Sequence, residues 1–218
     1  MIRAIRGGEL GRIAVFYFEW AGYGTRNVLG EWTLIDGPET AAAFGEALRR
    51  APVRAAMGTS ISGAIDFAAG LFDGNGFEGL RRVIDISGDG PNNTGPGVTA
   101  SRDAAVARGI TINGLPLMLR RTIGPFGIPD LDIYYEDCVI GGPLSFVLPL
   151  QASAKFAETI RRKLILEVAG LQPPPAAREA RVVPAQLGLG PAVREPRTDC
   201  LIGEKRRRRW MEGGGWDW

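Results

Sequence analysis

The sequence contains no histidine among its 218 residues. This absence excludes serine and cysteine nucleophiles activated by a histidine base, and it excludes HExxH and Cys2His2 zinc sites. Lysine is also scarce, because Lys155, Lys163 and Lys205 are the only lysines among 26 basic residues and the other 23 are arginines. A catalytic lysine therefore has few candidates, and most hydrolase and metalloenzyme mechanisms are excluded.

Cysteine is almost as rare. Cys138 and Cys200 lie far apart in the sequence and form no Cys-x-x-Cys pair. This spacing argues against a disulfide framework or a zinc cluster, so we expect two ordinary thiols. We expect Cys138 to be a small packed apolar residue rather than a nucleophile, because the sequence offers no base to activate it.

Long apolar runs are missing as well. No stretch reaches the roughly 18 apolar residues that a membrane span requires. Residues 1–8 include two arginines but lack the apolar core of a secretory signal. Read literally, the sequence predicts a cytoplasmic protein without a membrane span.

The charge distribution divides the chain into two parts. Residues 1–169 hold 17 basic and 18 acidic side chains, whereas residues 170–218 hold 9 basic and 6 acidic ones. From Pro173 onward the sequence is rich in proline and arginine and shows no periodicity. We therefore predict one globular domain over residues 1–169 and a disordered tail over residues 170–218.

Strand patterns and helix patterns follow one another along residues 1–169. From residue 38 onward their order is typical of an α/β protein. Strands are predicted at residues 12–20, 27–35, 82–87, 110–117 and 145–150, and helices at residues 39–50, 61–72, 99–108, 130–139 and 152–169. Strands that alternate with helices form parallel sheets. The sequence therefore predicts an α/β fold with a doubly wound, mostly parallel sheet.

Two segments combine glycines with oxygen-bearing side chains. Gly58–Ala64 (GTSISGA) opens a predicted helix, and Ile84–Gly90 (IDISGDG) ends a predicted strand. Ligands of open α/β sheets bind outside the carboxyl ends of the strands, where Asp89 is expected. A threonine hydroxyl and a carboxylate are hard oxygen ligands of the kind that Mg²⁺ favours. Thr59 and Asp89 are therefore candidate metal ligands.

The sequence resembles the von Willebrand factor type A (VWA) domain, in an uncharacterised bacterial branch known only as a domain of unknown function. The resemblance covers about residues 1–169 and rests on Arg81–Asn93 (RRVIDISGDGPNN), Thr111–Pro116 (TINGLP) and Asp137–Pro143 (DCVIGGP). It implies a three-layer αβα fold and a non-enzymatic protein-interaction module. In this family a metal-ion-dependent adhesion site (MIDAS) presents a metal to a carboxylate of a protein partner.

The resemblance also implies an incomplete metal site. Thr59 and Asp89 match the threonine and the aspartate of the MIDAS, but its Asp-x-Ser-x-Ser segment occurs nowhere in the sequence. Residues 1–6 resemble the end of the family's first helix, so the first strand is expected to be missing and strands 12–20 and 82–87 to expose their edges. We expect Mg²⁺ in a complete form of the domain and none in this chain. The alternative roles of the two residues are a helix N-cap and a turn aspartate.

Polar residues near these segments have possible functional and structural roles. Asn92 and Asn93 are candidates for a partner-binding rim, and the alternative is that they form a turn. Glu19 is either a rim residue or an exposed side chain. Asp85 is expected to pair with an arginine such as Arg102, because an isolated buried carboxylate is costly.

Two other functions remain open. One is an α/β enzyme that uses the Gly88–Gly90 turn for phosphate or nucleotide chemistry, although GxxxxGK[ST] and the GxGxxG spacing are absent. The other is binding of an anionic polymer by the basic, tryptophan-rich end of the tail, Arg206–Trp210, Trp216 and Trp218. One short cluster is weak evidence, so we do not expect a nucleic-acid partner. Relatives of the branch resemble exported proteins, so the alternative location is the periplasm if the true start lies upstream of Met1.

Overall fold

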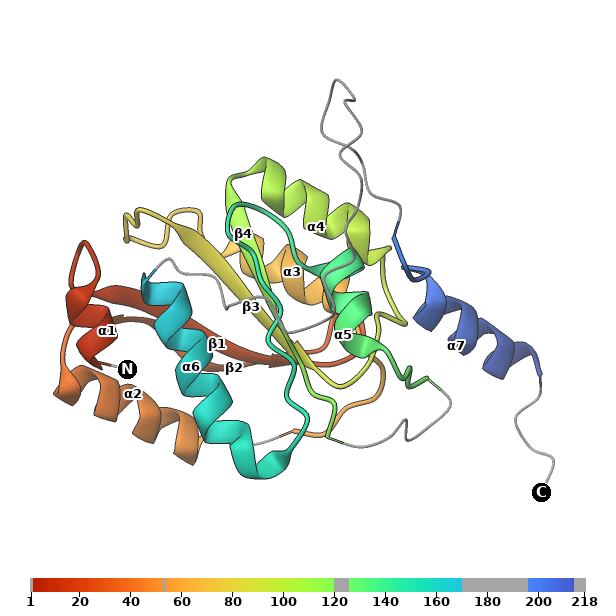
Figure 1. Ribbon diagram of the computed structural model, residues 1–218, viewed down its shortest axis with the longest axis horizontal. Helices are drawn as coiled ribbons and strands as arrows, with labels where there is room; N and C mark the ends of the chain where they lie inside the picture. Colours follow the sequence, from red (N-terminus) through yellow and green to blue (C-terminus); the bar gives the residue numbers. More distant parts are fainter. Residues whose placement is uncertain (1, 53, 120–125, 170–195, 214–218) are drawn as a thin grey trace, which may run out of the picture.

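The computed structural model describes residues 2–52, 54–119, 126–169 and 196–213 (Figure 1). The strands form two separate two-stranded sheets, β1 (Ile13–Trp20) with β2 (Arg26–Ile35) and β3 (Arg82–Gly88) with β4 (Ile110–Pro116). The helices are α1 (Ile2–Gly7), α2 (Pro38–Arg50), α3 (Ile61–Gly70), α4 (Val98–Ala107), α5 (Leu131–Tyr134) with a π-helical turn at Tyr135–Val139, α6 (Phe156–Ala169) and α7 (Ile202–Glu212). Within these ranges no helix is both long and apolar enough to cross a membrane.

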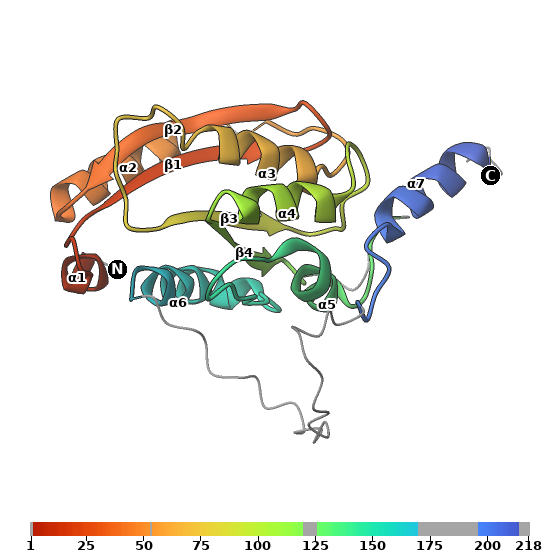
Figure 2. The same cartoon turned by 90° about the horizontal axis from the view of Figure 1, so that it is seen from above.

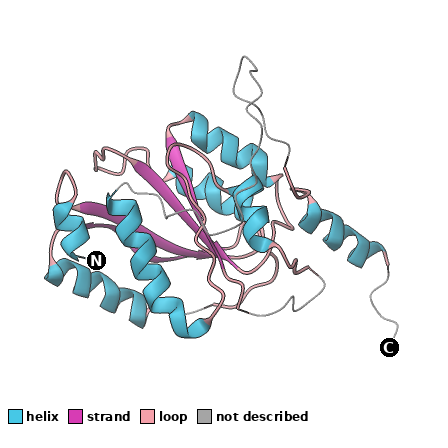
Figure 3. Ribbon diagram, viewed as in Figure 1, coloured by secondary structure: helices cyan, strands magenta, loops and turns pink. Residues whose placement is uncertain are grey.

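Helices cover both faces of the β3–β4 sheet. Figure 2 shows α3 and α4 on one side of these strands and α5 and α6 on the other. Helix α1 packs on α6, and α2 packs on β2. Figure 3 distinguishes the helices from the strands in the same view as Figure 1. The predicted α/β class is confirmed, with a parallel β3–β4 pair and an antiparallel β1–β2 hairpin.

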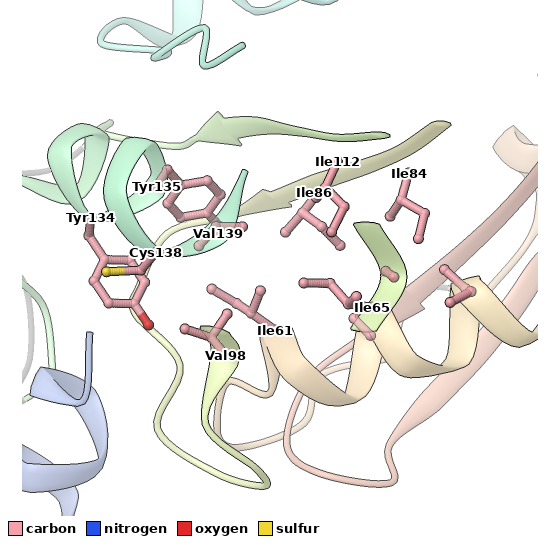
Figure 4. Packing of buried hydrophobic residues seen from close by; sticks show 14 of the residues in the cluster. Ile61, Ile65, Ile84, Ile86, Val98, Ile112, Tyr134, Tyr135, Cys138 and Val139 are labelled. Carbon is pink, nitrogen blue, oxygen red and sulfur yellow. The ribbon is translucent and has the colours of Figure 1, made fainter. Parts of the chain in front are cut away.

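The core lies between β3 and α3. Alternate residues of β3 point to opposite faces of the sheet, so Ile84 and Ile86 are buried while Asp85 points to the other side. Ile61 and Ile65 of α3 are completely buried against them (Figure 4). Burial of this apolar surface is the main force that attaches α3 to the sheet.

The predicted strand at residues 145–150 is wrong as a regular strand. The segment follows β4 through isolated parallel bridges of Val147 with Gly114 and of Leu150 with Leu117. Pro149 lies between these bridges and has no backbone N–H to donate. The segment therefore keeps two points of pairing but forms no continuous ladder.

The expected interruption between strands 12–20 and 82–87 is present. No backbone ladder joins β1 to β3 in the described ranges. Instead the ring of Phe18 on β1 packs edge-on against Phe67 of α3, with 4.9 Å between the ring centroids. The hairpin is thus attached to the rest of the fold through α3 rather than through a shared sheet.

The C-terminal part differs from the prediction of a disordered tail. Residues 196–213 are ordered and include α7, whereas residues 170–195 and 214–218 lie outside the described ranges. Cys138 and Cys200 form a disulfide with 5.5 Å between their Cα atoms, so the prediction of two free thiols is wrong. The two cysteines are 62 residues apart in the sequence, and the spacing alone therefore gave no sign of their proximity.

The predicted pairing of Asp85 with Arg102 is wrong. Asp85 accepts a hydrogen bond from Lys163 of α6, which is only 3% exposed and which also donates to Glu167. Arg102 instead pairs with Asp103. Lys163 of α6 therefore neutralises the carboxylate of Asp85, which points from β3 toward this helix.

The buried Glu167 predicts a pH-dependent stability. Burial is the largest cause that raises its pKa from 4.5 to about 8, followed by the adjacent Asp85. The folded state then binds more protons than the unfolded state between these values, so the free energy of unfolding falls as the pH rises from about 5 to 8. A single carboxyl group contributes at most about 1.4 kcal/mol per pH unit to this slope, and we expect Glu167→Gln to remove most of that contribution.

Urea denaturation across this pH window measures the effect. Glu158→Gln is the matched control, because Glu158 is an exposed residue of the same helix. A wild-type stability that rises over the window, or an equal slope in both variants, would contradict the assignment.

Candidate functional site

The carboxyl ends of β1 and β3 meet the start of α3 at a common edge. We call residues 21–25, 57–60 and 89–97 the loop edge. Backbone hydrogen bonds join these loops, from Ser60 N to Ala21 O at 2.7 Å and from Asn93 N to Thr59 O at 2.8 Å. The loops are therefore held to one another and not only to the elements that they connect.

Thr59 and Asp89 both lie in the loop edge. A Cβ added to Gly90 would lie 3.8 Å from Thr59 Oγ1, so the loop after β3 passes close to the hydroxyl. Asp89 is exposed. Burial raises the pKa of Tyr135, and the charge of nearby Asp89 adds to that rise. The structure thus places Gly90, the residue after Asp89, close to the hydroxyl of Thr59, although the two segments lie about 30 residues apart in the sequence.

Thr59 is not the N-cap of α3. The cap is Ser60, whose Oγ accepts a hydrogen bond from Gly63 N at 3.2 Å. The backbone of Thr59 bonds to Asn93, but its hydroxyl has no hydrogen-bond partner among the described residues. The N-cap role that was the alternative for Thr59 is therefore filled by its neighbour.

Asn92 is completely buried and binds several segments at once. Its Oδ1 accepts hydrogen bonds from the backbone N and the hydroxyl of Ser62, at 3.1 and 3.2 Å. Its Nδ2 donates to Pro96 O at 3.0 Å and to Glu204 Oε1 of α7 at 2.7 Å. Tyr134 Oη lies 3.2 Å from Asn92 N, which donates to it. The side chain fastens α3, the loop before α4 and α7 together.

Asn93 has a similar structural role. It is 5% exposed, and its Oδ1 accepts a hydrogen bond from Thr59 N at 2.8 Å. The amides of Asn92 and Asn93 therefore face inward and hold the loops, and they do not form the exposed rim proposed for them. Glu19 is half-buried, and its Oε2 is buried without a partner in the described ranges.

The donor chemistry of the site fits Mg²⁺, but the number of donors does not. Thr59 and Asp89 offer a hydroxyl and a carboxylate, whereas Mg²⁺ requires an octahedral shell of oxygens. The described residues contain no group of three or more acidic, cysteine or histidine side chains that would hold a metal. Thr59 and Asp89 alone therefore do not make up a coordination shell for Mg²⁺.

Sequence reasoning missed the contribution of the C-terminal segment. The guanidinium of Arg197 donates to Asp137 Oδ1 at 2.7 Å and to Asp137 Oδ2 at 3.1 Å, and Arg206 of α7 donates to Gly127 O. A Cβ added to Gly58 would lie 3.4 Å from Arg207 Nη1, so this guanidinium reaches the loop edge. Part of the basic cluster that was considered for anionic polymers is therefore engaged with the body of the protein.

Comparison with known proteins identifies a family match. The model of the family described as "Protein of unknown function (DUF1194)" matches residues 1–172. This confirms the expected branch known only as a domain of unknown function. No protein of curated function matches the sequence significantly.

Solved structures with a similar fold share little sequence with this chain. The conserved hypothetical protein BatB from Bacteroides thetaiotaomicron is 16% identical, with 71% of this chain and 80% of that chain covered and a TM-score of 0.43. An aerotolerance-related membrane protein from Bacteroides fragilis NCTC 9343 is 18% identical over 76% of this chain and 84% of that one, with a TM-score of 0.45. Proximal thread matrix protein 1 from the mussel byssus, with a zinc-occupied MIDAS motif, is 14% identical over 71% of this chain and 34% of that one, with a TM-score of 0.48. At these identities the likeness concerns the fold alone.

The contacts of Asn92 predict that its truncation is strongly destabilising. Asn92→Ala leaves the buried groups that it satisfies without partners, and we expect a loss of about 2–3 kcal/mol in the free energy of unfolding. Asn75→Ala is the matched control, because Asn75 bonds only the nearby Phe77 N in an exposed turn, and we expect it to cost less than about 1 kcal/mol. Urea denaturation measures both values, and equal losses would show that Asn92 is not the fastening residue.

Proposed function

Because the chain belongs to the DUF1194 family of proteins of unknown function, with a match over residues 1–172, we propose that it is a non-enzymatic, VWA-like protein-interaction module. Its interaction site is the loop edge, with an incomplete MIDAS formed by Thr59 and Asp89. The position of these residues carries the proposal, since ligands of α/β sheets bind outside the carboxyl ends of the strands. In this proposal residues 1–169 form the interaction domain.

The state of the two side chains supports this assignment. Asp89 is exposed, and the Thr59 hydroxyl has no hydrogen-bond partner among the described residues. The amide oxygens of Asn92 and Asn93 are instead used in holding the loops, since they accept hydrogen bonds from Ser62 and from Thr59 N. Thr59 and Asp89 therefore remain available for a ligand.

The partner that suits such a site is a protein that offers a carboxylate. In a complete form of the domain, Thr59 and Asp89 would hold Mg²⁺, and the metal would supply positive charge for the partner's acidic group. The residues of this chain contribute a rigid pair of oxygen donors at an exposed edge. They do not by themselves complete the coordination shell.

We also propose that the protein works in an oxidising compartment outside the cytoplasm. The supporting observation is the disulfide between Cys138 and Cys200, because such bonds persist mainly in exported proteins. This observation favours the periplasmic alternative over the cytoplasmic location.

The metal site predicts a magnesium-dependent thermal shift in an extended chain. We expect that a strand ending in Asp-x-Ser-x-Ser, fused ahead of Met1, supplies the missing ligands. A Mg²⁺ concentration of about ten times the Kd should then raise the Tm by roughly 3–6 °C. Asp89→Ala should abolish the shift, while Asp66→Ala, which removes an exposed carboxylate on α3, should leave it intact.

Two results would count against the site. One is an extended chain whose Tm does not respond to Mg²⁺. The other is a response that survives Asp89→Ala, since the metal would then bind elsewhere.

The compartment proposal predicts that no free thiol exists in the protein isolated from its native host. Iodoacetamide should label neither of the two cysteines before reduction and both after it, as measured by mass spectrometry of the intact chain. Labelling of both cysteines in the unreduced protein would place it in a reducing compartment.

A further inference from the structure

Helix α7 is held at the loop edge mainly by its first turn. Gly203 is its one buried residue, and a Cβ at this position would overlap the carbonyl oxygen of Asn92. Glu204, the next residue, accepts the hydrogen bond from Asn92 Nδ2. The contact with the body is therefore close but small in area.

The remainder of α7 faces solvent. Lys205, Arg208 and Arg209 are exposed, and Trp210 and Met211 are 47% and 65% exposed. The ring of Trp210 meets only the edge of Phe126, with 5.7 Å between the centroids. Beyond Ile202, which packs against the core, the helix buries little apolar surface, so the hydrophobic effect acts mainly at its first residue.

The polar contacts of α7 include an unfavourable one. The second carboxylate oxygen of Glu204, Oε2, is buried without a hydrogen-bond partner in the described ranges. Burial raises the pKa of Glu204, which shows that the ionised carboxylate is poorly solvated where it lies. An attachment of this kind depends on a tether that keeps the helix close to its contact.

The disulfide is that tether. Cys200 lies two residues before α7, and Cys138 is buried in the π-helical turn after α5, beside Tyr134 (Figure 4). Tyr134 Oη also donates to Cys200 O at 3.4 Å. The same short segment carries Arg197, which pairs with Asp137 and Glu136. Several contacts of the segment that leads into α7 are thus gathered around the bonded cysteines.

We propose that α7 is a redox-released cover of the loop edge, held closed by the Cys138–Cys200 disulfide and opened by a dithiol reductant. A thiolate of the reductant attacks the sulfur of half-buried Cys200, and Cys138 leaves as a thiolate that takes up a proton. The second thiol of the reductant then displaces Cys200, so two electrons pass to the protein and the reductant becomes a cyclic disulfide. Opening withdraws Glu204 from Asn92 and Arg207 from Gly58.

The release of α7 does not depend on the proposed function. Only the purpose of the opening does, because α7 lies against Asn92 and beside Gly58 of the loop edge, the same edge that carries Thr59 and Asp89. The test is therefore made without metal or partner, so a failed magnesium test leaves its outcome unaffected.

Hydrogen–deuterium exchange of the full chain, with and without dithiothreitol, tests the cover. We expect reduction to speed the exchange of residues 202–212 and 91–97 at least about tenfold, while β3 and β4 keep their protection. The Cys138→Ser/Cys200→Ser double variant should show the open pattern with or without the reductant. Unchanged exchange at residues 202–212 after reduction would overturn the proposal. Loss of protection throughout β3 and β4 would also overturn it, because the disulfide would then support the whole domain.

A second variant opens the cover without touching the cysteines. Gly203→Ala places a methyl group against Asn92 O, and we expect it to give the fast exchange at residues 202–212 with the disulfide intact. Gly45→Ala is the matched control, because a Cβ on this helical glycine of α2 meets no atom within 4 Å. Exchange at residues 202–212 that is equally slow in both variants would show that the contact of Gly203 with Asn92 does not hold α7.

Discussion

The buried amide of Asn92 is the contact on which the arrangement of the loop edge depends. A primary amide offers two donors and an acceptor oxygen, and here all three functions are used within the protein. The partners belong to the start of α3, to the loop before α4 and to α7, which are far apart in the sequence. Since a buried polar group without a partner is costly, these hydrogen bonds hold the start of α3 and the loop before α4 in place and also bind α7 while it is closed. Thr59 and Asp89 lie in loops of this edge, whose positions depend on these hydrogen bonds.

Helix α3 provides the second constraint, because it is shared by the two sheets. Ile61 and Ile65 pack against β3, while Phe67 of the same helix meets Phe18 of β1. No ladder joins the sheets in the described ranges, so side-chain packing on α3 must align them. The start of α3 also carries the cap Ser60 next to Thr59. The alignment of the sheets and the position of the candidate ligand therefore depend on one helix.

Local patterns in the sequence predicted most of the fold and the two candidate ligands. Apolar periodicity located β3 and α3, and the glycines around Asp89 located the turn at the end of the strand. What these patterns did not predict were pairings between distant residues. Asp85 pairs with Lys163 rather than with Arg102, and Cys138 with Cys200, because partners are chosen by the packing of α6 and of the C-terminal segment. The burial of Asn92 and Asn93 also results from packing between distant segments. The residue type alone did not predict it, because an asparagine suits a turn or an exposed rim equally well.

The charged character of α7 explains why its place in the fold was not predictable, and it also explains how the helix is held. A helix is recognised in a sequence by an apolar stripe, and α7 has four consecutive arginines in place of one. The lack of a stripe means that little apolar burial favours its attachment, so polar contacts and a covalent bond must hold it. Polar contacts within a protein are readily replaced by contacts with water. A disulfide, in contrast, is broken by reaction with a thiol and not by thermal motion. A segment without a hydrophobic face is therefore suited to attachment that a change in redox conditions can reverse.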